Sequence, residues 1–213
     1  MTRTAQPDTI ISGTINKKIC LWNIKTGKLK KFYKGHTKSL KCLEVLSERF
    51  FASGSNDSTI RIWHFQTNKC VRTLMGHTNS VFCLKKLNEF QFASGSQDQS
   101  IKIWGSFENS IECVRTLYVN WGTITRLEVV ESLNFLVSSS MVIHVWNMNT
   151  YQCVWRLIPN QSSTVKCLRI LPNKRIITGQ KNKTLELFCL NTGKSLRVIK
   201  DVDVYLIEAI SVF

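Results

Sequence analysis

Short runs of alternating apolar and polar residues, bounded by glycine, serine, asparagine and aspartate, recur along the whole chain. In one of them Phe90 and Phe92 are expected on one face of a strand, with Gln91 on the other face. A Ser-Gly-Ser segment, a turn and Ile-Lys-Ile-Trp follow. Such alternation is typical of half-buried strands, and no segment keeps a helical period. The pattern therefore predicts an all-β chain.

The alternating pattern also repeats with a nearly fixed period. One aromatic slot recurs at intervals of 41, 41, 42 and 42 positions and is occupied by Trp22, Trp63, Trp104, Trp146 and Phe188. A period of this length indicates a repeat architecture. We therefore expect five units of four strands each. In the second unit the strands are expected over residues 38–45, 49–55, 58–64 and 69–74.

The repeated motifs are Gly-His, Ser-Gly-Ser-x-Asp and Ile-x-Ile-Trp, and they resemble those of the WD-repeat family over nearly all of residues 8–210. The resemblance implies a β-propeller, here with about five four-stranded blades. We treat residues 1–213 as a single propeller domain. Its units are approximately 8–33, 34–74, 75–117, 118–157 and 158–200, with a closing strand at 204–210.

The two ends of the chain leave two arrangements open. The chain starts in the second strand of a unit, near Asp8–Thr14, and residues 204–210 have the pattern of a first strand. Pairing the two would complete the first blade, close the ring and leave no open sheet edge. Alternatively, the chain is a piece of a larger propeller, because the resemblance implies that seven blades are more common.

The resemblance assigns a structural role to four recurring polar positions. It implies that the turn aspartate accepts a hydrogen bond from the Gly-His imidazole, that the strand serine positions this imidazole, and that the tryptophan indole N–H lies beyond the serine. Two units carry complete sets, His36, Ser53, Asp57 and Trp63, and His77, Ser94, Asp98 and Trp104. These residue types also occur in hydrolase triads, but two copies at one spacing favour a scaffold. The other units carry Asn16, Asn120 and Asn182 at the His or Asp positions, so packing is expected to dominate there.

Composition excludes several classes of protein. No apolar run reaches the roughly 18 residues of a membrane span, and the opening residues lack a secretory signal. A soluble cytoplasmic protein is expected, with a nuclear location not excluded. The 8 cysteines contain no Cys-x-x-Cys and accompany only 4 histidines, so we interpret them as small buried hydrophobes. No catalytic residue, metal or cofactor is predicted, because phosphate loops and nucleophile elbows are also absent from the sequence.

The net charge of +15 is unevenly distributed. Residues 1–45 and 166–200 each carry +8, whereas residues 46–165 carry +2. Because strands alternate in direction, the connection into each unit and its Ser-x-Asp turn emerge on one side, which we call the Asp-turn side. Six lysines are expected there and would form a crescent in a closed ring: Lys17, Lys18, Lys34, Lys38, Lys181 and Lys183.

The charge indicates either an acidic partner or only a solvated, soluble face. Further candidate contacts are the inner-strand residues Lys41, Phe82, Lys166 and Tyr205, and Trp121 in a loop, where an aromatic side chain would be an interface anchor or would pack on a neighbouring blade. We interpret the chain as a non-enzymatic scaffold that presents a rigid face to partner proteins, including acidic segments, within a multiprotein complex. The alternative is binding of nucleic acid or of an acidic or phosphorylated ligand through the basic sector, although no nucleic-acid motif is present. No membrane association is predicted.

Overall fold

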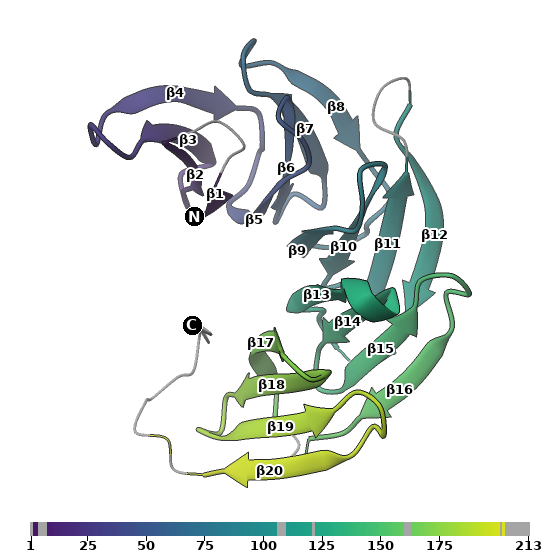
Figure 1. Cartoon of the computed structure of the whole chain (residues 1–213). Coiled ribbons are helices and arrows are strands. Elements are labelled where there is room, and N and C mark those ends of the chain that lie inside the picture. The colour runs from purple at the N-terminus through teal and green to yellow at the C-terminus, as the bar shows by residue number, and fades with distance from the viewer. Residues whose placement is uncertain are drawn as a thin grey trace. The chain divides into compact units, whose positions relative to one another are not determined.

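The computed structural model describes residues 2–3, 8–105, 110–120, 122–159, 163–200 and 202, the first two by their backbone alone. Over these residues the fold is all-β, apart from one short 3-10 helix, Glu131–Leu133. Its strands form five four-stranded antiparallel sheets, numbered here as blades 1 to 5 (Figure 1). The fold class expected from the sequence is confirmed.

Strands that are consecutive in sequence pair within each blade, so the first and fourth strands form its edges. Blade 1 contains β1 (Thr2–Arg3), β2 (Thr9–Gly13), β3 (Lys18–Asn23) and β4 (Leu29–Lys34). Blade 2 contains β5 (Leu40–Val45), β6 (Phe50–Ser55), β7 (Ile60–His64) and β8 (Cys70–Leu74). Blade 3 contains β9 (Val81–Lys86), β10 (Gln91–Ser96), β11 (Ser100–Gly105) and β12 (Glu112–Tyr118). Blade 4 contains β13 (Arg126–Val130), β14 (Phe135–Ser139), β15 (Ile143–Asn147) and β16 (Cys153–Leu157), and blade 5 contains β17 (Val165–Leu171), β18 (Arg175–Gln180), β19 (Leu185–Cys189) and β20 (Ser195–Ile199).

The first edge of blade 1 differs from the prediction. The sequence placed the start of the chain in the second strand and left this edge for residues 204–210. In the structure β1 occupies the edge, with Thr2 opposite Ile11 and Arg3 opposite Ile10. Residues 204–210 lie outside the described part of the chain. The sequence reading missed β1 because two residues are too few to show alternation.

The contacts divide the chain into two compact units, Met1–Tyr118 and Val119–Phe213. The first contains blades 1 to 3, and the second contains blades 4 and 5. In the second unit, facing sheets share a core that includes Val145, Ile176 and Phe188. Face-to-face burial of apolar side chains is therefore what holds neighbouring blades together.

In the first unit the repeated aromatic slot packs in the same way twice. Leu21 of blade 1 belongs to one core with Phe51 and Trp63 of blade 2. The rings of Phe51 and Trp63 are stacked at 6.3 Å and 18°, and those of Phe92 and Trp104 in blade 3 have the same separation and angle. The packing of the aromatic residues therefore repeats with the same period as the sequence.

A glycine on β6 allows blades 2 and 3 to approach closely. A Cβ atom on Gly54 would lie 2.5 Å from Cys42 Sγ and 2.8 Å from Val81 Cγ1. We expect Gly54→Ala to lower the free energy of unfolding in urea by about 2 kcal/mol, as overpacking does in cores. Gly13→Ala is the matched control, because its nearest atom, Leu40 Cβ, would lie at 3.3 Å. An equal loss in both variants would contradict this explanation.

Two details of the sequence reading are wrong. Phe92 is fully buried on β10, but Phe90 precedes the strand and is 68% exposed. The Phe90 N–H donates to Asn88 Oδ1 at 2.8 Å, which closes a turn before the strand begins. Among the cysteines, all eight are free, and Cys83 and Cys167 are buried as expected. Cys113, in contrast, lies on an edge strand and is exposed.

Candidate functional site

Four side chains of blade 2 form a continuous series of hydrogen bonds, which we call the relay. The Trp63 indole Nε1–H donates to Ser53 Oγ at 2.8 Å. Ser53 Oγ lies 2.7 Å from His36 Nε2, and His36 Nδ1 lies 2.8 Å from Asp57 Oδ2. Because an ionised carboxylate only accepts, Nδ1 carries the proton and the serine hydroxyl donates to Nε2. The relay thus connects the loop before β5 to the turn between β6 and β7.

Blade 3 contains a second relay with nearly identical geometry. Trp104 Nε1 donates to Ser94 Oγ at 2.8 Å, and Ser94 Oγ lies 2.7 Å from His77 Nε2. His77 Nδ1 lies 2.7 Å from Asp98 Oδ2. The structure therefore brings all eight residues of the two sets into these two series.

The aspartate of each relay has further donors. In blade 2, Asp57 Oδ1 accepts from the Thr59 hydroxyl at 2.7 Å and Oδ2 accepts from the Thr37 N–H at 2.9 Å. Burial by itself would raise the pKa of Asp57, but the hydrogen bonds from Thr59, Thr37 and His36 outweigh it and hold this pKa well below its usual value. Burial lowers the pKa of His36, so its imidazole stays neutral near pH 7.

The relay has the atoms of a Ser-His-Asp triad but gives a substrate no access. Ser53 and Ser94 are 0% exposed, and each hydroxyl oxygen already accepts a hydrogen bond from an indole. A nucleophile must reach the reacting carbon from an open site. These two sets therefore act as braces between a loop and a turn.

Blade 1 gathers exposed lysines on its Asp-turn side. Lys17 is in the turn between β2 and β3, Lys18 begins β3, and Lys34 ends β4. Lys18 and Lys34 lie opposite each other in the ladder, and Lys38 follows in the loop that leads to blade 2. We call these four residues the lysine cluster. Among the described residues none of them has an acidic partner within ion-pair distance.

Two further predicted residues meet on the first strands of blades 2 and 3. The Lys41 Nζ atom lies 5.2 Å from the centre of the Phe82 ring, a cation–π contact between neighbouring blades. Lys41 is exposed and Phe82 is half-buried. Both side chains belong to the first unit and are therefore accessible to a binding partner.

The remaining candidates lie in the second unit or outside the described residues. Lys181 and Lys183 are exposed in the turn between β18 and β19, and Lys166 is half-buried on β17. Trp121 and Tyr205 lie outside the residues that the structure describes. The crescent of six lysines remains a prediction, with four members in the first unit and two in the second.

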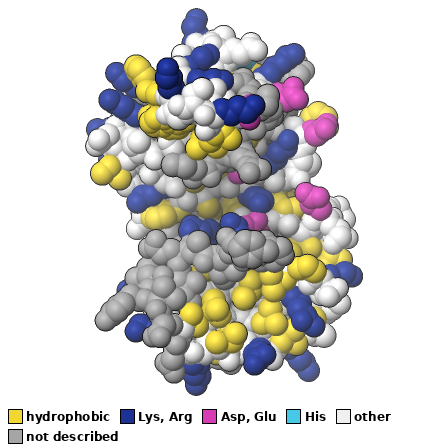
Figure 2. Space-filling model, turned by 60° about the vertical axis from the view of Figure 1, so that its left-hand side comes forward, with side chains coloured by type: hydrophobic (Ala, Val, Ile, Leu, Met, Phe, Trp, Pro, Cys, Tyr) yellow, Lys and Arg dark blue, Asp and Glu magenta, His cyan; other side chains and the backbone are white. Residues whose placement is uncertain are grey.

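The surface in Figure 2 shows many more basic than acidic side chains, as the net charge of +15 requires. Within the described residues, no group of three metal-ligating side chains comes together. No helix among the same residues is long and apolar enough to cross a membrane. Basic side chains thus outnumber acidic ones on the face in view.

Comparison with known proteins places the relays in a family. The family model of the WD domain, G-beta repeat, matches residues 27–64 and 68–105. Two segments of the chain therefore match the WD repeat. The two matched segments include both complete relays, and no curated protein matches the chain. WD repeats commonly mediate protein–protein interaction, and their fold is typically without enzymatic activity.

The other three blades lack a complete relay. In blades 1 and 4 the indole still donates to the strand serine, from Trp22 to Ser12 at 2.8 Å and from Trp146 to Ser138 at 2.9 Å. In blade 5 the aromatic slot is Phe188, which has no N–H to donate. That packing dominates in these blades remains a prediction.

Sequence reasoning missed a second position, two residues before the aromatic slot. In blade 4 it is His144, which is 2% exposed and stacks on Trp146 at 5.6 Å and 17°. In blade 5 it is Glu186, which is 1% exposed and accepts from Gln180 Nε2 at 3.1 Å and Ser195 Oγ at 2.6 Å. The available signal was an ionisable residue at this position between two apolar strand residues.

Proposed function

We propose that this protein binds an acidic segment of a partner protein through the lysine cluster. The cross-strand pair Lys18–Lys34 is the observation that carries the proposal. Like charges directly opposite in a ladder destabilise a sheet, and no acidic side chain among the described residues neutralises this pair. A carboxylate-rich partner would supply the missing charge. The relays support this role because they fix the loop and turn geometry of blades 2 and 3.

Lysine is the side chain expected for such a partner. All four members of the cluster are lysines, each of which offers a point charge without the bidentate fork that arginine presents to phosphate. The Lys34 Nζ atom also lies 5.0 Å from the centre of the Phe32 ring, which is 51% exposed. An acidic segment with apolar residues would therefore find both kinds of contact on blade 1.

Charge reversal at two matched places tests the proposal. The triple variant Lys17→Glu, Lys34→Glu and Lys38→Glu should bind a fluorescein-labelled deca-glutamate peptide at least about tenfold more weakly, since each exposed ion pair contributes up to ~1 kcal/mol. The control reverses Lys28, Arg49 and Lys69 on the opposite side and alters the net charge equally. Anisotropy titrations should show little loss for the control. Equal losses in both variants would show that only the net charge matters.

The same titration distinguishes the alternative ligand. Affinity for a single-stranded oligonucleotide should fall log-linearly with salt if nucleic acid is the partner. If the protein binds the oligonucleotide more tightly than the peptide, and only the cluster variant loses this binding, the partner is nucleic acid rather than an acidic protein segment.

A further inference from the structure

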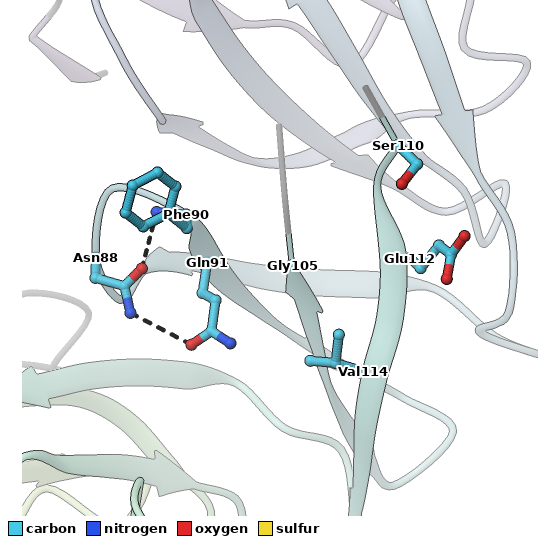
Figure 3. Close-up of a pocket in the computed structure, with 7 residues that line it drawn as sticks. All are labelled: Asn88, Phe90, Gln91, Gly105, Ser110, Glu112 and Val114. Atoms are coloured by element: carbon cyan, nitrogen blue, oxygen red, sulfur yellow. Dashed lines mark hydrogen bonds between the residues drawn. The ribbon is translucent and has the colours of Figure 1, made fainter. Parts of the chain in front are cut away.

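Blade 3 has a pocket on the side opposite its Asp-turn side (Figure 3). Its volume is ≈ 640 Å³. The residues that line it come from the turn before β10, the end of β11 and the start of β12: Asn88, Phe90, Gln91, Gly105, Ser110, Glu112 and Val114. The lysine cluster lies on another blade and on the Asp-turn side, so the pocket is a separate place on the molecule.

The pocket exists because blade 3 lacks an aromatic pair that blade 2 has. Phe50 lies opposite His64 in the β6–β7 ladder, with ring centres 5.1 Å apart. The corresponding pair in blade 3 is Gln91 and Gly105. Figure 3 shows the side chains of Gln91 and Val114 facing each other on either side of Gly105. Removing two rings at one ladder position leaves open space between these walls.

No other blade has glycine at this ladder position. The corresponding pairs are Thr9 with Asn23 in blade 1, Phe135 with Asn147 in blade 4, and Arg175 with Cys189 in blade 5. The pocket is therefore a local departure from the repeat.

The charge at the pocket also departs from the repeat. Glu112 lies opposite the last residue of β11. In each of the other blades, the N–H group at the position of Gly105 donates to the carbonyl of the residue that corresponds to Glu112. These residues are Lys28, Lys69, Gln152 and Lys194. Residues 87–112 carry four acidic residues and one basic residue, in a chain with net charge +15. Among the described residues that line the pocket, Glu112 is the charged one.

Several groups at the pocket have unused bonding capacity. Neither the Glu112 carboxylate nor the Ser110 hydroxyl has a hydrogen bond or ion pair with any described residue. Gln91 accepts from Asn88 Nδ2 at 3.3 Å through Oε1, which leaves its Nε2 hydrogens free to donate. Phe90 is 68% exposed and Val114 is 46% exposed. The pocket thus offers an anionic acceptor, a hydroxyl, an amide donor and two apolar surfaces.

We propose that this pocket binds an arginine side chain of a partner protein. A guanidinium matches a carboxylate with two parallel N–H donors, which fits Glu112. Its methylenes contact Val114, and the Gln91 amide donates to a carbonyl of the partner's backbone. Lysine fits less well because its ammonium lacks this fork.

A peptide titration followed by NMR tests the proposal on the full chain. The probe is acetyl-Ala-Arg-Ala-amide, and the comparison peptide carries norleucine in place of arginine. The arginine peptide should shift the Gly105 backbone amide and the Gln91 side-chain amide saturably, and norleucine should not. Glu112→Gln should weaken this binding about tenfold, as expected for a hydrogen bond to a charged group. Glu48→Gln, in the turn before β6 of blade 2, should leave it unchanged.

Filling the pocket provides a second, independent variant. Gln91→Phe with Gly105→His copies the blade 2 pair and should abolish the shifts while the urea midpoint is retained. Equal shifts with norleucine, or binding that survives Glu112→Gln, would overturn the proposal, and so would the absence of any shift. If the filled variant unfolds, the Glu112→Gln result decides. The lysine-cluster variant should retain these shifts, so this inference and the proposed function can fail separately.

Discussion

Replacing Asp98 by alanine will lower the free energy of unfolding by about 3 kcal/mol, the cost of breaking a buried charged network. The carboxylate accepts from His77 Nδ1 at 2.7 Å and from the Ser100 hydroxyl at 2.6 Å. It also accepts from the N–H groups of Thr78 and Ser100, at 3.0 and 2.9 Å. Alanine removes every one of these acceptor sites at once, and the buried imidazole N–H keeps only the longer contact with the Ser100 hydroxyl, at 3.3 Å.

Urea unfolding followed by tryptophan fluorescence will measure this loss. Asp57→Ala should cost the same, because the blade 2 relay has the same contacts. Asp98→Asn is the matched control and should cost distinctly less. Its carbonyl oxygen can still accept, and blades 1 and 5 carry asparagine in this slot. A loss below about 0.5 kcal/mol for Asp98→Ala, the size of an ordinary surface substitution, would show that the relay contributes little.

The stability of the second unit will decrease as the pH falls from 7 to 5, and His144 will account for about 2 kcal/mol of the decrease. Burial, together with the charge of Arg156, lowers the pKa of His144 to about 4. In the unfolded chain the pKa is near 6.5, so at pH 5 the unfolded state binds a proton that the folded state does not. The stabilisation is complete above pH 6.5 and is lost as the pH falls towards 4.

His144→Phe should remove this part of the pH dependence. A phenyl ring can keep the stacking on Trp146 but cannot be protonated. Urea unfolding of the wild type and the variant at pH 8, 7, 6 and 5 gives the comparison. The free energies of unfolding of the two proteins should differ by a constant amount between pH 8 and 7. Below pH 7 the variant should become progressively more stable relative to the wild type. Parallel curves down to pH 5 would mean that His144 is accessible to protons in the folded state.

The predictions that succeeded rest on short-range features of the chain. The strands of blade 2 begin within two residues of their expected positions, because the alternation and the bounding turn residues are local signals. The relay residues were found because the WD-repeat resemblance assigns a role to each of these positions, and their spacing repeats along the chain. Asp57 and Ser53, for example, are separated by one turn of a hairpin, so their proximity follows from local geometry.

The features that the sequence reading missed have three different causes: a local turn, a slot without a common residue type, and a pairing across a ladder. Phe90 fits the alternation but is excluded from β10 by a turn that Asn88 closes. The slot that holds His144 and Glu186 has no common residue type, so no motif marks it. The pocket of blade 3 likewise requires Gln91 and Gly105 to be opposite each other, a pairing between two strands that neither strand shows by itself.

The sequence by itself determined the five repeats, the all-β class and the WD-repeat resemblance, because each follows from periodicity and motifs within one chain segment, and the resemblance in turn implied the membership of the two relays. Only the tertiary structure decided that Lys18 opposes Lys34, that β1 forms the first edge of blade 1, and that blade 3 has a pocket lined by Glu112. These features arise from cross-strand register and from the space left between side chains. Both are properties of pairs of segments rather than of any single stretch.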